Sequence, residues 1–149
     1  MEDTAIRILD ARRIMALSTV RPDGWPQTTI VGYANDGLTL YFVIFRASQK
    51  FANIAHDGRV SVAVGEEPPD MRLASAVFAG ALAEEVTDAT ERQRAWRLLV
   101  QRHPNLAGRP EPDWSSAAMI RADCRHVSVL DYSKGLGHTD ALHFADDRD

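Results

Sequence analysis

Two tight-turn sequences divide the first third of the chain into three strand-like runs, and this pattern constrains the fold most. The first turn is RPDG at residues 21–24, where proline presets the turn backbone and glycine accepts a left-handed conformation. The second is NDG at residues 35–37, a strong hairpin signal. The runs 14–20, 28–33 and 38–45 are rich in β-branched, aromatic and other apolar residues. They predict a meander of three antiparallel strands.

The rest of the chain adds strand-like runs separated by helical segments. Six strands are expected in all, at residues 14–20, 28–33, 38–45, 60–64, 73–86 and 119–130. Helices are expected from about 3 to 13, from 47 to 56, and from an N-cap at Asp88 to Pro104. The regular alternation of strand and helix that a doubly wound sheet requires is absent. The pattern predicts a mainly β fold, a six-stranded antiparallel barrel with inserted helices, and Gly80 is its candidate bulge.

Length and composition indicate one ordinary domain, residues 1–149, with an acidic, frayed tail from about residue 140. Apolar residues make up 45% of the chain, but no apolar run approaches the roughly 20 residues that cross a bilayer, so no membrane partner is expected. The N-terminus lacks the basic and apolar parts of a signal peptide. Cys124 is the single cysteine, which excludes an internal disulfide. The expected location is the cytoplasm.

Charge and residue spacing exclude several classes of function. The net charge of −4 and the pI near 5.7 argue against a nucleic-acid partner. The five histidines show no zinc-ligand spacing, so no metal site is expected. No serine stands in a hydrolase elbow, and no catalytic residue is identified from spacing alone.

Arg46, Ser48 and Lys50 stand where the third strand gives way to the second helix, with no carboxylate nearby in the sequence. A helix N-terminus carries unpaired N–H groups and a partial positive charge, so acids are favoured there and cations are not. The missing negative charge would then come from a bound phosphate or carboxylate. The alternative is that both cations are solvated side chains on an exposed turn.

Two further features leave alternatives open. Trp25 directly follows the first turn, and it is either an ordinary core or interface residue or a contact with a cofactor or partner subunit. The segment 132–140 is either a flexible turn that leaves the last strand or an anion-binding loop. If it folds over a cofactor, Tyr132, Lys134 and His138 are the side chains that would touch a substrate.

Residues 16–64 carry a resemblance to a known family. The matching pieces, in order, are LSTV at 17–20, RPDGWP at 21–26, QTT at 27–29, LYFV at 40–43, SQKFANI at 48–54 and RVSV at 59–62. This ordered set resembles the pyridoxamine 5′-phosphate oxidase-like, FMN-binding split-barrel family, and the resemblance extends more loosely to Val86. It implies a homodimer of split barrels with two FMN molecules at the subunit interface.

The resemblance also implies which residues hold the cofactor. The FMN phosphate would be held at Ser48, Gln49 and Lys50, with Arg46 as a substitute contact because Gln49 stands where the family commonly has arginine. The flavin ring would be lined by Gln27, Thr28 and Thr29 and by the end of the third strand at Val43, Ile44 and Phe45. Ser75 corresponds to a glutamine that often contacts the flavin in the family.

The implied activity is that of an FMN-dependent oxidoreductase with a small-molecule substrate or an electron donor such as a nicotinamide nucleotide. The full-length oxidase of the family has a C-terminal region with a tryptophan and paired arginines that grips the substrate phosphate, and this chain has no such segment. Oxidation of pyridoxamine phosphate is therefore not expected. The alternatives are a deazaflavin-dependent reductase and a non-catalytic flavin or haem carrier or sensor.

Overall fold

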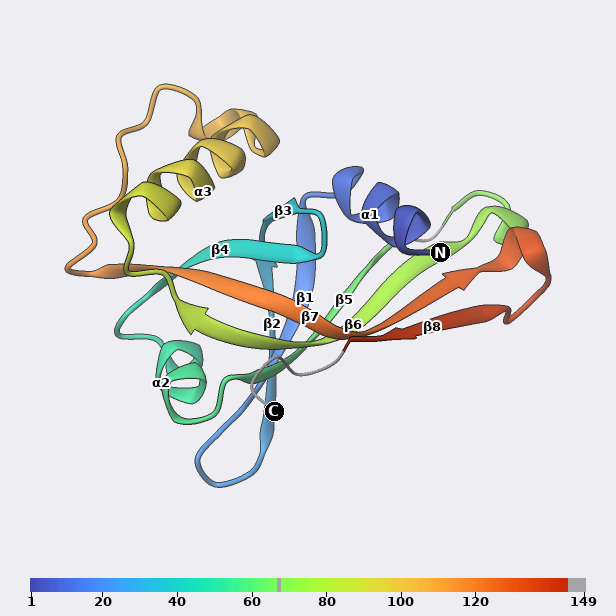
Figure 1. The fold of residues 1–149 in the computed structure, drawn as a ribbon, viewed down its shortest axis with the longest axis horizontal. Helices are drawn as coiled ribbons and strands as arrows, with labels where there is room; N and C mark the ends of the chain where they lie inside the picture. Colours follow the sequence, from blue (N-terminus) through green and yellow to red (C-terminus); the bar gives the residue numbers. More distant parts are fainter. Residues whose placement is uncertain (67, 145–149) are drawn as a thin grey trace.

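The computed structural model describes residues 1–66 and 68–144, which form one curled antiparallel sheet with three α-helices around it (Figure 1). The strands are β1 Ile14–Val20, β2 Pro26–Gly32, β3 Ala34–Asp36, β4 Thr39–Phe45, β5 Arg59–Gly65, β6 Ser75–Glu85, β7 Ala117–Asp131 and β8 Thr139–His143. The helices are α1 Glu2–Asp10, α2 Gln49–His56 and α3 Ala89–Arg102, with short 3-10 turns η1 Met71–Leu73, η2 Pro104–Leu106 and η3 Tyr132–Lys134. The predicted mainly β barrel with inserted helices is confirmed.

The sheet curls because one segment of the chain contributes to both of its ends. The strand order is β2-β1-β5-β6-β7-β4-β3, and only Tyr33 separates β2 from β3 along the chain. Tyr33 is fully buried, and its hydroxyl donates a hydrogen bond to the carbonyl of Leu9 at 2.6 Å. The segment therefore leaves one edge of the sheet at Gly32 and joins the other edge at Ala34, which closes the barrel at this end.

The expected three-strand meander is wrong in its pairing. β2 pairs with β1, whereas β4 pairs with β7 along its whole length and with β3 over three residues. Residues 28–33, expected as one strand, are divided by the bend at Tyr33, which adds β3 to the strand count. The hairpin signal at residues 35–37 is confirmed, since it joins β3 to β4.

The second additional strand is β8, which overlaps the tail that was expected to fray. It pairs with β7 over five residues, from Leu130 opposite Thr139 to His126 opposite His143. Leu142 and Phe144 pack against the main core, and this apolar contact stabilises β8. The acidic composition of the tail did not predict an ordered strand there. Residues 145–149 of the expected tail lie outside the described part of the chain.

β4 is buried on both faces, which explains why its sequence is a continuous apolar run. Leu40, Phe42 and Ile44 lie in the barrel core, which they share with residues of β1, β5, β6 and β7. Tyr41 and Val43 belong to a second apolar cluster, formed where α3 covers the outer side of β4 and β7. Alternate side chains of a strand point to opposite faces, so one strand serves two cores.

Two local signals act as expected. Asp88 is the N-cap of α3, and its carboxylate accepts a hydrogen bond from the backbone N–H of Glu91 at 2.8 Å. The pairing of β6 with β7 shifts at Gly80, where Gly80 faces His126 and Ala81 faces Cys124, so Arg125 is the extra residue of a β-bulge.

Among the described residues, no helix is both long and apolar enough to cross a membrane.

Candidate cofactor site

The curled sheet leaves an opening between β2 and the end of β4. In the described part of the chain, β2 has a strand partner on only one side, β1. β4 pairs with β3 only through residues 39–41, so residues 42–45 have β7 alone as a partner. Because β2 continues through Tyr33 into β3, these two free edges border the same opening. Free strand edges present backbone N–H and C=O groups that a ligand can satisfy.

The alternation of β2 divides the three residues predicted to line a flavin ring. Gln27 and Thr29 lie on the inner, half-buried side of the strand, whereas Thr28 lies on the outer side. The Thr28 hydroxyl is already hydrogen-bonded to Ser18 at 2.7 Å. One ligand on the inner side would therefore meet the side chains of Gln27 and Thr29, and it could reach Thr28 only through its backbone.

Thr29 carries the clearest sign of a missing partner. Its hydroxyl oxygen is buried and has no hydrogen-bond partner among the described residues. An unsatisfied buried hydroxyl costs on the order of 1–3 kcal/mol, and a polar ligand in the opening would remove that cost. The donor and acceptor groups on this side of β2 therefore fit a ligand with a polar edge, such as the pyrimidine part of a flavin.

A chain of side-chain amides joins β2 to α2 at the base of the opening. Asn53 is completely buried, and its amide nitrogen donates hydrogen bonds to Thr19 at 2.9 Å and to Gln27 at 3.0 Å. The side-chain amide of Gln49 donates in turn to the Asn53 oxygen at 2.8 Å. These bonds fix the first turn of α2 against β1 and β2, because breaking any of them leaves a buried polar group unpaired.

The start of α2 has the character predicted for an anion site. Ser48 is its N-cap, accepting a hydrogen bond from the N–H of Phe51 at 3.2 Å and donating one to the carbonyl of Phe45 at 2.6 Å. The first turn contains no acidic residue, and Lys50 lies in it, half-buried. Positive charge without an acid at a helix start is the arrangement that binds a phosphate.

Arg46 is directed elsewhere, and the carboxylate that the sequence seemed to lack is supplied by β6. The Arg46 guanidinium forms a two-pronged ion pair with Glu85, at 2.9 and 2.6 Å, and also donates to the carbonyl of Trp114. These bonds hold the pKa of Glu85 below its usual value. Arg46 therefore ties the start of α2 to the loop before β7, and as placed it is not available as a phosphate contact.

The alternation of β4 likewise separates its three predicted residues. The side chain of Ile44 lies in the barrel core, so it cannot face a ring in the opening. Val43 and Phe45 point to the other side and line a groove of about 480 Å³ beneath α3. Trp96, Leu99 and other apolar residues of α3 and the following loop form the opposite wall. The groove suits a flat apolar group.

His103 is a polar residue of this groove that sequence reasoning did not single out. Its Nε2 lies 2.8 Å from the carbonyl oxygen of Tyr33, and a carbonyl can only accept, so Nε2 carries the hydrogen. In a neutral imidazole this leaves Nδ1 as an acceptor. The ring lies against Gly32, where a Cβ atom would come within 3.1 Å of it. Its position just before Pro104, at the end of α3, was the available signal.

Other predicted residues lie at the opposite end of the molecule. Ser75 begins β6 and pairs with Asp131 at the end of β7, whereas β4 pairs with the first seven residues of β7. Asp131 is eight positions beyond Asp123, or roughly 26 Å of extended strand. Lys134 and His138 at this end are engaged with Asp140, at 3.3 and 3.1 Å. Within one chain, none of these side chains is near the start of α2.

Trp25 lies at the tip of the hairpin between β1 and β2, and its side chain is 71% exposed. It therefore contributes to neither core cluster, which contradicts its predicted role as a core residue. The alternative is a contact at an interface or with a cofactor or partner subunit. That role remains a prediction.

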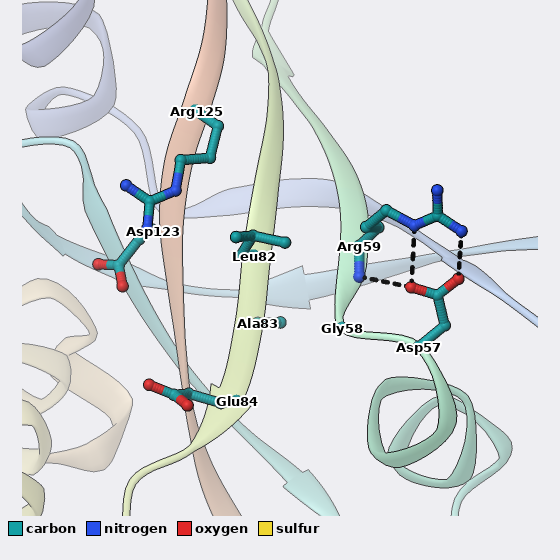
Figure 2. Close-up of a pocket in the computed structure, with 8 residues that line it drawn as sticks. All are labelled: Asp57, Gly58, Arg59, Leu82, Ala83, Glu84, Asp123 and Arg125. Atoms are coloured by element: carbon teal, nitrogen blue, oxygen red, sulfur yellow. Dashed lines mark hydrogen bonds and ion pairs between the residues drawn. The ribbon is translucent and has the colours of Figure 1, made fainter. Parts of the chain in front are cut away.

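A separate hollow of about 370 Å³ lies between β5, β6 and β7 (Figure 2). Three carboxylates and two guanidinium groups line it, from Asp57, Glu84, Asp123, Arg59 and Arg125. Asp57 and Arg59 form an ion pair at 2.8 Å, drawn as dashed lines. This excess of negative charge does not suit a phosphate, and none of the residues predicted to bind a cofactor lies here. Three or more metal-ligating side chains do not gather anywhere in the described residues.

The curled sheet with an opening between its edges defines a split barrel. The sequence profile of the family described as Pyridoxamine 5′-phosphate oxidase matches residues 1–131, so the chain belongs to this family. Comparison with curated proteins gives no match.

Several solved structures share the fold. A haem-binding protein from Mycobacterium smegmatis superposes with a TM-score of 0.78 at 19% identity, covering 95% of this chain and 56% of the other, so this chain spans little more than half of its length. An FAD-binding protein from Mesorhizobium loti gives 0.68 at 24% identity, covering 85% and 91%. An F420 reductase gives 0.66 at 25% identity, covering 81% and 93%. The resemblance found in the sequence is thus confirmed at the level of family and fold.

Proposed function

We propose that this protein is an FMN-dependent oxidoreductase of the cytoplasm that binds the cofactor in the opening between β2 and β4. The observation that carries the proposal is the start of α2, where Lys50 and an acid-free first turn lie at the base of two free strand edges. The buried, unpartnered hydroxyl of Thr29 on the same opening supports a polar ligand. No other site in the described residues combines these features.

The residues of this chain then have distinct tasks. Lys50 and the N–H groups of α2 bind the phosphate, with Ser48 and Gln49 in contact beside them. Gln27, Thr29 and the free edge of β2 hold the polar edge of the ring. Val43, Phe45 and the α3 groove exclude water from one face and leave room for a substrate that is mostly apolar. Bound FMN would supply the electron and hydride chemistry that no side chain here can perform.

We further propose that a second copy of the chain covers the outer face of β2, β1, β5 and β6. One row of this face reads Ile30, Ala16, Ala63 and Phe78 across the paired strands. Ile30 is 66% exposed and Phe78 43% exposed, and Ile14 beside them is 60% exposed. Large apolar side chains beside small ones form a flat apolar surface of the kind that homodimers bury.

The dimer is tested by sedimentation of the wild type and of Phe78→Asp. A charge in the centre of the face is expected to convert a dimer into a monomer, whereas Leu136→Asp, at a more exposed apolar position at the far end, leaves the dimer intact. A wild-type monomer at micromolar concentration would contradict the proposal.

The function is tested by the absorbance of the purified protein and by rapid mixing. We expect a flavin spectrum that is bleached by a nicotinamide nucleotide and restored by an electron acceptor. A flavin that binds without being reduced would instead support a carrier or sensor. A colourless protein that takes up F420 but not FMN would support a deazaflavin reductase, the class of one structural neighbour.

Haem binding is the second candidate, and His103 is the observation that favours it. Its Nδ1 borders an apolar groove, which is the setting of an axial ligand, and the Mycobacterium smegmatis neighbour is a haem-binding protein. A Soret band that is lost in His103→Ala would replace the flavin proposal with this one. FMN binding that persists in His103→Ala with no Soret band in the wild type would exclude it.

A further inference from the structure

His126 on β7 and His143 on β8 face each other directly across the edge of the sheet. Their Nδ1 atoms are 2.7 Å apart, and the two rings meet edge to face with centroids 5.0 Å apart. Directly opposed residues of antiparallel strands project from the same face, which accounts for the close approach. Both side chains are exposed, so a solute can reach the pair.

The two nitrogen atoms converge on one point. At 2.7 Å one Nδ1 must carry a hydrogen and the other must accept it, so a single hydrogen occupies the space between two lone-pair donors. A neutral imidazole nitrogen is the commonest metal ligand in proteins. We propose that a divalent transition metal replaces this hydrogen and that His126 and His143 chelate it through their Nδ1 atoms.

The ligand type selects the metal. The 2.7 Å between the Nδ1 atoms is the length of a hydrogen bond. With metal–nitrogen bonds of about 2.0 Å, two ligands lie about 2.8 Å apart at a right angle and about 3.3 Å apart at a tetrahedral angle, so a small turn of the two exposed rings admits either geometry. Imidazole suits Cu²⁺, Ni²⁺ and Zn²⁺, and Cu²⁺ has the highest affinity in the divalent series. The pair is therefore assigned to Cu²⁺.

The surroundings agree with a site built from imidazole alone. Gly80 lies opposite His126 on β6, and a Cβ atom there would make ordinary contact with the ring at 3.4 Å. A neighbouring hollow of about 390 Å³ is lined by Arg59, Arg125, His126 and apolar side chains, with no carboxylate among the described residues that line it. Such a setting disfavours Mg²⁺ and Ca²⁺, which prefer oxygen ligands.

Metal binding would fasten β8 to the sheet. β8 pairs with β7 alone in the described part of the chain, and His143 is the last residue of the strand. A bridge from His143 to His126 would therefore hold the end of an edge strand that otherwise depends on its backbone ladder and on Leu142 and Phe144. This site does not involve the opening between β2 and β4, so it stands or falls independently of the proposed cofactor.

The experiment is calorimetric titration of chelator-treated protein with Cu²⁺, together with electron paramagnetic resonance of the bound ion. We expect one strong site per chain with nitrogen ligation, weakened at least tenfold in both His126→Ala and His143→Ala. His138→Ala and His56→Ala are the controls and should keep the site. Amides of residues 139–143 should exchange more slowly with copper in the wild type, and this protection should vanish in the two variants.

Several results would overturn the proposal. It fails if either variant at the pair keeps wild-type copper affinity, or if a control variant removes the strong site. Tighter binding of Zn²⁺ than of Cu²⁺ would reject the assignment to copper. Circular dichroism of His126→Gln and His143→Gln, which retain hydrogen-bonding side chains at exposed positions, separates loss of metal from loss of fold.

Discussion

The two ends of this molecule differ in how their polar groups are satisfied. At the α2 end, buried amides are joined into a chain through Asn53, and two strand edges remain free. At the far end, where η1 and η3 meet beyond β6 and β7, β8 is an edge strand with β7 as its one partner in the described residues, and the charged side chains pair with one another near the surface (Figure 1). The buried network of polar side chains thus lies at the α2 end, whereas the far end depends on ion pairs near the surface.

The largest difference between the two ends is expected when Asn53, the centre of the side-chain amide network, is removed. Asn53→Ala leaves Gln27, Gln49 and Thr19 without a common partner, so we expect a loss of about 2–4 kcal/mol in the free energy of unfolding. Asp140→Asn at the far end breaks only exposed pairs and should cost less than about 0.5 kcal/mol. Urea denaturation measures both. Equal losses at the two ends would refute the contrast.

The second change removes the charge at the start of α2. Lys50→Ala should weaken FMN binding by about 1.5–3 kcal/mol, the contribution of a charge-assisted hydrogen bond to a phosphate. Riboflavin, which has no phosphate, should bind the variant and the wild type alike, as measured by quenching of flavin fluorescence. Lys134→Ala is the matched control at the far end. A variant that loses affinity for both flavins equally would show that Lys50 supports the fold and not the phosphate.

A smaller effect is expected where β2 meets α3. Gly32→Ala places a Cβ atom 3.1 Å from the His103 ring, which must move and weaken its bond to the Tyr33 carbonyl. We expect about 1 kcal/mol of destabilisation and a shifted spectrum of the bound cofactor. Gly24→Ala, at a positive φ of 89° in the exposed hairpin turn, should also lose stability through backbone strain, but it should leave the spectrum unshifted, since no atom lies within 4 Å of its Cβ position. An unshifted spectrum in Gly32→Ala would show that His103 does not contact the cofactor.

The smallest effect concerns the ion pair between Arg46 and Glu85, and it depends on pH. The folded state lowers the pKa of Glu85 from the ordinary 4.5, chiefly through hydrogen bonds from Arg46. This stabilisation is fully present above pH 4.5 and is lost as the pH falls through the lowered pKa. The difference in stability between the wild type and Glu85→Gln should therefore shrink in that range. A difference that stays constant from pH 6 to pH 3 would contradict it.

Local patterns predicted the elements well, because their causes are local. The apolar run of β4, the cap at Asp88 and the bulge at Gly80 depend on neighbouring residues, and all three occur as expected. β8 was missed because its order comes from pairing with β7 and from the packing of Leu142, neither of which its own acidic sequence reveals.

The candidate site was predictable only in part, because its geometry is not local. The sequence identified Ser48 and Lys50 as the start of a helix, and that start is where it was expected. It could not indicate that Arg46 would meet Glu85, 39 residues further on, or that His103 would return to Tyr33, 70 residues back. Nor could it decide which face each residue of β2 and β4 presents, since that depends on which strands pair.

Because the chain passes from one edge of the sheet to the other at Tyr33, the barrel can close only late in biosynthesis. The β1 and β2 hairpin can form as soon as it leaves the ribosome, but β4 has its long partner in β7, whose residues 117–123 are made about 80 residues later. Until then one wall of the opening has no support, and the cofactor proposed for it would have no complete site. Under the proposed function, loading would therefore follow nearly complete synthesis, and a ribosome stalled before residue 117 would present a half-built barrel without this site.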